Sequence, residues 1–181
     1  MTLPQPLQRV RAVTAPLPLS NIRVIELSLN WAGPMSTQCL ATMGAEVIKV
    51  ESIQRMDDQR GVKRAAKGVP RYPDKEPGER PWNRSAQFNQ INRNKMGITL
   101  DIGHPKGKEI LFRLVRMSDA VVDNYPFRAR KKFGITYAIL KEIKPDIKCL
   151  GCIENNIVAW DRAKLSRGEI FDDVCLESGK Y

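Results

Sequence analysis

Polar residues follow two apolar runs of the sequence, at places where they could bind a ligand. Ser28–Pro34 comes directly after the run Ile22–Leu27, and Asp123–Pro126 comes after Ala120–Val122. In proteins with an open α/β sheet, ligands bind at the carboxyl ends of the strands and against the N-termini of the helices that follow. If the protein has a binding site, its floor therefore lies in Ser28–Pro34, with Asp123–Pro126 as a second expected contact.

Basic residues offer a second kind of binding chemistry. The 181-residue chain has 30 Lys and Arg against 20 Asp and Glu, which gives a formal net charge of +10. Nine of the basic residues lie between Arg55 and Arg84, and a dense cluster spans Arg128–Lys132. This balance favours an anionic partner, such as nucleic acid, membrane phosphate or a phosphorylated small molecule, without choosing among them. The segment 52–90, rich in Gly and Pro, is either a solvated excursion or a basic flap over an anionic ligand.

Cysteine and histidine form no recognisable reactive or metal-binding pattern. The four cysteines are too few and too scattered for a disulfide framework. Cys149 and Cys152 have redox-motif spacing, but they lie in an apolar run and follow no helix start that would stabilise a thiolate. We interpret them as small buried residues of a strand. With His104 as the single histidine and no second cysteine pair, we expect no metal site.

Strands and helices alternate along the chain and would position these residues. Apolar runs predict strands at 22–27, 46–50, 98–102, 120–122 and 147–153, and helical spacing predicts helices at 35–43, 105–117 and 137–143. This alternation favours an α/β fold with a Rossmann-like, mostly parallel sheet and helices on both faces. The sequence has no G-x-G-x-x-G, Walker A or G-x-S-x-G pattern, so the usual dinucleotide, nucleoside triphosphate and hydrolase fingerprints are missing.

The length suits one domain with its own core. We predict a flexible N-terminal arm at 1–19, because four prolines interrupt any helix there, an α/β region at 20–153, and a divergent tail at 154–181 without clear periodicity. No apolar run reaches the length of a membrane span. Together with the few cysteines, this predicts a protein of a soluble, reducing compartment, the cytoplasm.

Short motifs spread over residues 20–148 share a characteristic order and spacing. They are Ile22–Ser28, Ala32–Pro34, Leu40–Glu51, Asn92–Lys95, Ile98–Asp101, Pro105–Gly107, Asp119–Tyr125, Phe133–Tyr137 and Lys144–Ile147. Each motif is weak alone. In this order the set resembles the N-terminal part of the class III CoA-transferases, the carnitine dehydratase and bile-acid-inducible family, which includes formyl-CoA transferases.

The resemblance implies a Rossmann-like large domain whose N-terminal part binds CoA. It also implies an interlocked homodimer in the full-length protein, and CoA transfer between an acyl-CoA and a carboxylic acid through an aspartyl-CoA thioester. The CoA-contacting positions that it implies are Leu29, Asn30, Trp31, Ala32, Leu100, Asn124, Tyr125 and Lys132. Arg93 and Lys95 could contribute, and a solvated role beside a strand is an equal alternative for both.

The sequence departs from the family pattern at several places. The residues after Asn124-Tyr125 are Pro126–Arg128, where the family has Arg-Pro-Gly, and the family's Gly-rich loop does not follow Ile147. The family's nucleophilic aspartate belongs to a downstream Gly-Asp segment that we do not find, and Asp172 and Asp173 fit better as exposed tail carboxylates. We therefore expect an acyl-CoA:carboxylate CoA-transferase, or a truncated derivative that keeps the CoA-binding half and is inactive alone.

Three alternatives follow from the same observations. The chain could be a non-catalytic CoA-binding or interaction subunit that pairs with a longer chain. It could be a relative of α-methylacyl-CoA racemase. A nucleic-acid-binding protein would explain the net charge, but the aromatic residues are not interleaved with the cations as stacking platforms require. We accordingly expect neither a nucleic-acid nor a membrane partner.

Overall fold

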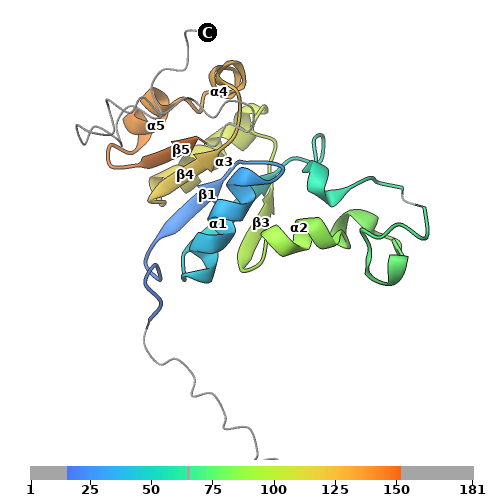
Figure 1. The fold of residues 1–181 in the computed structure, drawn as a ribbon. Helices are drawn as coiled ribbons and strands as arrows, with labels where there is room; N and C mark the ends of the chain where they lie inside the picture. Colours follow the sequence, from blue (N-terminus) through green and yellow to red (C-terminus); the bar gives the residue numbers. More distant parts are fainter. Residues whose placement is uncertain (1–15, 65, 152–181) are drawn as a thin grey trace, which may run out of the picture.

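The computed structural model describes residues 16–64 and 66–151, which fold around one parallel sheet (Figure 1). The five strands are β1 (Arg23–Glu26), β2 (Glu46–Glu51), β3 (Lys95–Thr99), β4 (Ala120–Asp123) and β5 (Lys148–Gly151). Their order in the sheet is β3-β2-β1-β4-β5, and every neighbouring pair is parallel. The chain thus builds outward from β1 to β3 and then returns to the other side of β1. The predicted parallel α/β sheet is confirmed.

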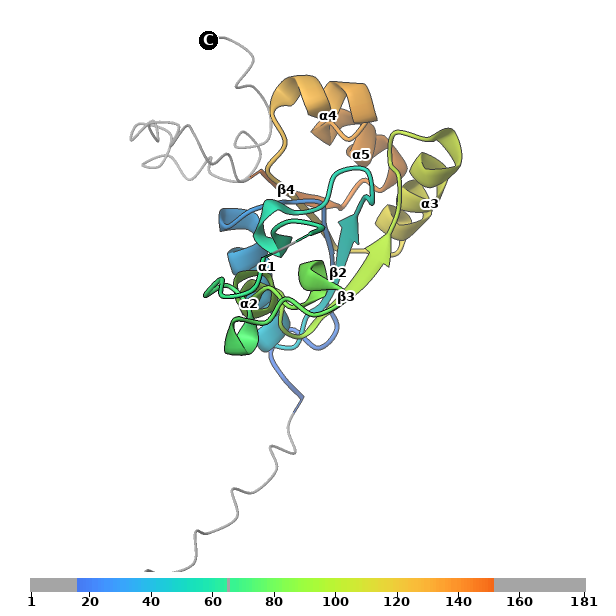
Figure 2. The ribbon, with the colours of Figure 1, turned by 90° about the vertical axis from the view of Figure 1, so that its right-hand side faces the viewer.

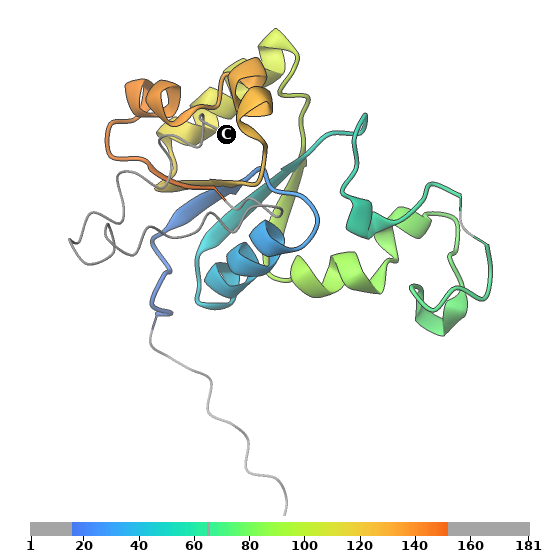
Figure 3. The same cartoon turned by 45° about the horizontal axis from the view of Figure 1, so that its top comes forward.

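Helices cover both faces of the sheet, as the alternation predicted (Figure 3). One face carries α1 (Ala32–Thr42) with α2 (Ala86–Ile91) beside it, and the other carries α3 (Pro105–Arg116), α4 (Phe127–Phe133) and α5 (Tyr137–Ile143) (Figures 2 and 3). Because successive side chains of a strand point to opposite faces, Val24 packs in the core on the α1 side. Ile25 packs with α3 and α5 on the other side.

Strand β3 begins three residues before the predicted start at Ile98 and ends at Thr99. The alternating apolar residues that suggested a strand over 98–102 do not all belong to the sheet. Leu100 and Ile102 lie beyond the ladder and pack in the core that contains Leu111 of α3. The strand instead begins with Lys95, whose charge is neutralised by a partner far away in the sequence. Local periodicity cannot show such a partner.

The helices also differ from the prediction in extent and number. Helix α1 begins at Ala32 rather than at Met35, so Pro34 lies in its first turn, where a proline costs no intrahelical hydrogen bond. Helices α2 and α4 were not predicted. Helix α4 contains the basic cluster Arg128–Lys132 and buries no residue fully, so it shows no apolar stripe in the sequence. The bounds of α5 are those predicted.

The segment that follows β2 contains three short 3-10 helices before α2. These are η1 (Asp58–Arg60), η2 (Pro73–Lys75) and η3 (Pro81–Asn83). The segment extends to the side of the sheet beyond β3 (Figures 1 and 3). Arg60 attaches it to the sheet, because its guanidinium pairs with Glu51 at the end of β2 and lies 3.6 Å from the ring centroid of Phe88 in α2.

The predicted arm and tail lie almost entirely outside the described residues. Of the arm, residues 16–19 are described, and they lead into a turn in which the Leu19 N–H donates to the carbonyl oxygen of Met43, 3.0 Å away. Residues 154–181, with Asp172 and Asp173, fall outside the described part, as does Cys152. The flexible arm and the divergent tail stay predictions.

Candidate functional site

The loops after β1 and β4 meet at the point where the sheet order reverses. These strands are neighbours, with Glu26 paired to Val122, but the chain leaves them toward opposite faces. Asn124 joins the two loops: its Oδ1 accepts from the Leu29 N–H at 2.9 Å, and its Nδ2 donates to the Leu29 carbonyl oxygen at 2.6 Å. In open α/β sheets this reversal point forms the ligand-binding crevice.

The β1 loop turns sharply before α1. Asn30 has a φ of 65°, in the left-handed region that Asn tolerates better than most residues. At the start of the helix, Gly33 lies so close to Ser28 that a Cβ at Gly33 would be 2.2 Å from the Ser28 Oγ. Only a glycine therefore allows α1 to begin at this distance from the strand end. The N-terminus of α1, which has no acidic residue in its first turn, lies directly after the loop.

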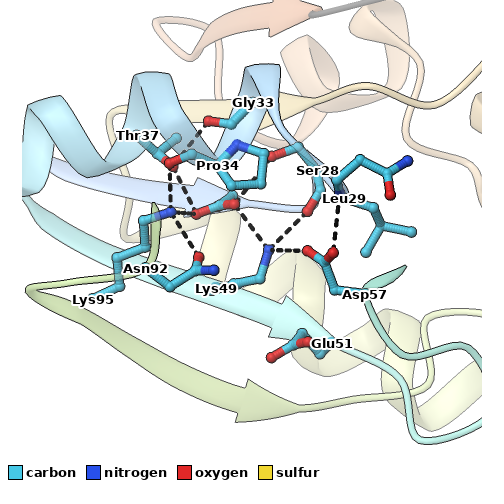
Figure 4. Close-up of polar contacts among 12 residues, drawn as sticks. Ser28, Leu29, Gly33, Pro34, Thr37, Lys49, Glu51, Asp57, Asn92 and Lys95 are labelled. Carbon is cyan, nitrogen blue, oxygen red and sulfur yellow. Dashed lines mark hydrogen bonds and ion pairs between the residues drawn. The ribbon is translucent and has the colours of Figure 1, made fainter. Parts of the chain in front are cut away.

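Beneath the loop lies a buried network of two acids and two lysines (Figure 4). Glu26 is fully buried, and its two oxygens lie 3.0 Å from the Lys49 Nζ and 2.8 Å from the Lys95 Nζ. Thr37 of α1 donates to the same carboxylate at 2.7 Å. Asp57 is also fully buried, 3.2 Å from the Lys49 Nζ. The network joins β1, β2, β3, α1 and the segment after β2.

The lysines of this network also bind backbone oxygens around the loop. The Lys49 Nζ donates to the Ser28 carbonyl at 2.9 Å, and the Lys95 Nζ donates to the Pro34 carbonyl at 2.7 Å. Lys95 makes a further hydrogen bond to the Asn92 Oδ1 at 2.9 Å. Both ends of the β1 loop are thus held from below by buried cations, whose polar hydrogens find partners within the protein.

Burial and charge act in opposite directions on these groups. Burial raises the pKa of the Glu26 carboxyl, but the two lysines and the hydrogen bonds outweigh it, so the pKa lies below the usual 4.5. Burial also lowers the pKa of Lys95 to about 8, although attraction to Glu26 opposes the shift. Glu26 and Lys95 are therefore both mainly ionised at neutral pH, and Lys95 loses its proton early as the pH rises.

At the end of β4 a second buried pair positions Tyr125. The Asp123 Oδ1 accepts from the Tyr125 N–H and from the Arg130 Nε, both at 2.8 Å. Burial raises the pKa of Asp123, and Arg130 opposes the rise. The Tyr125 ring packs against Phe133 of α4 at a centroid distance of 5.6 Å. The position of the Tyr125 ring is therefore set by the hydrogen bond of its own backbone N–H and by its contact with α4.

Six of the predicted contact residues gather at the crevice. Leu29, Asn30, Trp31 and Ala32 form the turn into α1, and Asn124 and Tyr125 lie across from it. Leu29 is buried and Asn30 is half-buried, whereas Trp31 and Ala32 are exposed. The sequence alone placed these positions at two strand ends, and the neighbouring order of β1 and β4 brings them together.

The other two predicted contact residues lie elsewhere. Leu100 follows β3 at the far edge of the sheet, and its side chain packs in the core on the α3 side. Lys132 is exposed on α4, with its Nζ 5.9 Å from the Phe133 ring centroid. Lys95, a further candidate, is buried in the network, while Arg93 is exposed.

The buried network was not predicted as part of the site. Part of its signal is present in the sequence: Glu26 and Lys49 each stand between two apolar residues of a predicted strand. The structure makes them partners in the β1–β2 register. Opposite charges at interior positions of neighbouring strands predict a buried pair. Asp57 gave no such signal, because it lies in the irregular segment after β2.

The fold and the crevice define the class of this protein: a doubly wound α/β protein with the ligand crevice of that fold where its strand order reverses. Comparison with known proteins identifies the family. The family model described as CoA-transferase family III matches residues 19–152, so the chain belongs to that family.

Known relatives share about a third of their aligned residues with this chain. It is 39% identical over 130 residues to a succinate–glutarate CoA-transferase of Agrobacterium fabrum, in an alignment that covers 72% of this chain and 30% of the relative. It is 37% identical over 129 residues to a formyl-CoA:oxalate CoA-transferase of Streptomyces coelicolor, with coverage of 71% and 28%. The crystal structure of a CAIB/BAIF family protein from Brucella suis aligns with a TM-score of 0.63 and 36% identity over 75% of this chain and 33% of the other. The chain thus spans about a third or less of the length of these relatives.

Two further features concern metals and membranes. Among residues 16–64 and 66–151, no group of three or more His, Cys, Asp or Glu side chains is arranged to hold a metal ion. Within the same residues, none of the helices is long and apolar enough to cross a membrane.

Proposed function

We propose that this chain binds CoA or an acyl-CoA in the crevice between the loops after β1 and β4. The bidentate contact of Asn124 with Leu29 carries the proposal, because it fixes both loops at the point where the strand order reverses. Family membership supports CoA as the ligand, and relatives such as the A. fabrum protein are named as CoA-transferases.

The chemistry of the crevice suits this ligand. The exposed ring of Trp31 offers an apolar surface to a planar base or to the pantetheine chain. The N-terminus of α1 lies beside it and favours negative charge or carbonyl oxygens. Lys132 on α4 provides a cation for a phosphate group as a charge-assisted partner. These contacts with CoA are proposals, as are those of Leu100 and the other predicted residues.

We further infer that this chain does not transfer CoA when it is alone. Transfer through a thioester requires a carboxylate that can attack the acyl group. Near the crevice, three buried carboxylates are each ion-paired with a cation: Glu26, Asp57 and Asp123. Each of them therefore has a structural role. We therefore propose a CoA-binding part of an acyl-CoA:carboxylate CoA-transferase. The interlocked homodimer and the cytoplasmic location stay predictions of the resemblance and of the composition.

Calorimetric titration of the purified chain with CoA tests the proposal. We expect saturable binding of one CoA per chain that persists when NaCl is raised from about 50 to about 200 mM. Binding to a DNA duplex of the same concentration should instead collapse over this range, because counterion release dominates such contacts. Absence of CoA binding, or DNA binding that outlasts it, would contradict the proposal.

A transfer assay tests the inferred lack of catalysis. The donors and acceptors are those of the relatives' names: succinyl-CoA with glutarate, and formyl-CoA with oxalate. We expect no transfer by this chain. Any transfer would contradict the inference, and its loss in Asp172→Ala would assign the nucleophile to Asp172.

A further inference from the structure

Side chains, rather than sheet pairing, hold the backbone of the crevice loop. The last ladder-like contact of β1 is the hydrogen bond from the Leu27 N–H to the Val122 carbonyl. Beyond it, the Ser28 carbonyl accepts from Lys49, and Leu29 is bound by Asn124. The Asn30 N–H donates to the Asp57 Oδ1 at 3.2 Å. Three consecutive residues are therefore held by side chains from three different parts of the chain.

Asp57 is the point where these contacts converge. Its Oδ1 accepts from the backbone N–H groups of Asn30 and Gln59, the latter at 2.9 Å, and its Oδ2 lies 3.2 Å from the Lys49 Nζ. Lys49 in turn contacts Glu26 and the Ser28 carbonyl. One carboxylate thus links the crevice loop, β2 and the start of η1.

The stability of the fold does not by itself explain why Asp57 and Lys49 form a buried ion pair. A buried ion pair loses most of its Coulombic gain to desolvation, and an apolar pair of similar volume is often as stable or more stable. What the pair provides is geometry, because the Lys49 Nζ lies within 3.2 Å of oxygens from three separate residues. Asp57, one of the three, also holds the N–H of Asn30, the residue with the left-handed φ that turns the loop into α1.

We propose that Asp57 and Lys49 are positioning residues for CoA binding. They touch no part of the proposed ligand position themselves. They set the backbone of Ser28–Asn30 and thereby the direction in which Leu29–Ala32 face the crevice. This role rests on the proposed function, since it concerns the affinity of that same site.

Two charge-balanced double variants test the role. Lys49→Met with Asp57→Asn, the amide variant, removes the ion pair but keeps a side-chain oxygen for the Asn30 N–H. Lys49→Met with Asp57→Leu, the apolar variant, has nearly the same side-chain volume and keeps no acceptor. Neither variant leaves an unpaired charge at these two positions, and Glu26 keeps Lys95 and Thr37. We expect the apolar variant to bind CoA at least about tenfold more weakly than the amide variant, a difference of about 1.4 kcal/mol.

NMR reports on the backbone of the loop, and a comparison of the CoA Kd with Tm separates a positioning role from a purely structural one. In ¹⁵N–¹H spectra without CoA, the amide resonances of Leu29–Ala32 should differ between the amide and apolar variants, with the largest change at Asn30. Asp119→Ala is the control: it removes the acceptor of the Arg23 N–H at the opposite end of β1. It should lower Tm while leaving these resonances and the CoA Kd unchanged.

The outcomes separate the two proposals. If the wild-type chain does not bind CoA, the proposed function is wrong and the positioning role falls with it. If the wild type binds CoA but the two double variants bind it equally, the positioning role alone is wrong. The same conclusion follows if the CoA affinity simply tracks Tm across all variants, including Asp119→Ala.

Discussion

The Asn124 side chain forms both hydrogen bonds of the Leu29 backbone across the crevice, at 2.9 Å to its N–H and 2.6 Å to its carbonyl oxygen. A side-chain amide offers a donor and an acceptor side by side, as a backbone residue does. The contact takes the place of a ladder hydrogen-bond pair where β1 and β4 have already ended. Asn124 therefore extends the sheet by one residue pair at the place where the chain leaves the two strands toward opposite faces, and so closes the floor of the crevice.

Asn124→Asp should weaken CoA binding and destabilise the fold. The aspartate keeps an acceptor for the Leu29 N–H, but it sets a carboxylate oxygen against the Leu29 carbonyl. We expect a loss of about 1–3 kcal/mol in unfolding free energy by urea titration, and a higher CoA Kd by calorimetry. Asn21→Asp, at an exposed position before β1, is the matched control because it makes the same change of side chain and adds the same charge. Equal effects of the two substitutions would show that charge, and not the contact, is responsible.

Stability should rise with pH in the alkaline range because of Lys95. Its pKa is about 8 in the folded chain and 10.5 as the ordinary value. Between these values the unfolded chain holds more protons than the folded one, so the unfolding free energy increases with pH. The total increase is about 3 kcal/mol once Lys95 has lost its proton in both states. Urea titrations from about pH 7.5 to about pH 10.5 measure this slope.

Two variants identify the group responsible for that slope. Lys95→Met should lack this part of the rise, while Lys67→Met, at an exposed position, should keep it. A rise that is identical in wild type and Lys95→Met would assign the slope to another group.

The stability that Glu26 contributes should be lost in acid, as is usual for a carboxylate that has gained cationic partners. Its folded pKa lies below the ordinary 4.5, so its contribution to stability is complete above pH 4.5 and is lost as the pH falls through the folded value. Glu26→Gln leaves Lys49 and Lys95 without their shared partner, and we expect a loss of about 3–5 kcal/mol at neutral pH. The difference from wild type should shrink as the pH falls below the ordinary value, measured by urea titration. A difference that stays constant far into the acid range would exclude Glu26 as the acid-sensitive group.

The sequence predicted the sheet well because the determinants of a parallel sheet are local. Apolar runs such as Ile22–Leu27 and the helix over Tyr137–Ile143 carry their own periodicity, and the parallel pairing follows from the alternation of strands with helices. The site was predicted only in part. Leu29 and Asn124 are 95 residues apart, and the sequence shows that each follows a strand but not that the two strands are neighbours.

The buried network and α4 were missed for a different reason. Pattern analysis treats a charged residue as a sign of solvent, and this holds for most lysines. Lys49 and Lys95 violate it because their partner, Glu26, lies on another strand and offsets part of the cost of burial. Helix α4 was missed because its basic residues conceal its helical period, although Gly134, with a φ of 69°, marks its end in the usual way.

Arg60 should control the attachment of the segment after β2. Its guanidinium forms two hydrogen bonds with Glu51, one with the Trp82 carbonyl, and stacks on Phe88. Arg60→Lys keeps the charge but loses the planar, bidentate geometry. We expect trypsin to cleave within residues 61–80 several-fold faster in this variant under native conditions. The control Lys67→Arg preserves the number of trypsin sites in the segment, and an equal cleavage rate in both variants would exclude Arg60 as the attachment.

Gly33→Ala should disturb the crevice by moving the start of α1. A Cβ at this position would lie 2.2 Å from the Ser28 Oγ and 2.3 Å from its Cβ, so α1 must shift away from the end of β1. Overpacking of this kind costs about 1–3 kcal/mol, and the shift would also separate Thr37 from Glu26. Gly97→Ala is the matched control, because nothing lies within 4 Å of the position its Cβ would take. We expect Gly33→Ala to lower both Tm and CoA affinity and Gly97→Ala to change neither.

Ser28→Gly in the Gly33→Ala background removes the clashing atoms and should restore part of the loss in Tm. If that second substitution restores nothing, the contact between Ser28 and Gly33 does not determine where α1 begins.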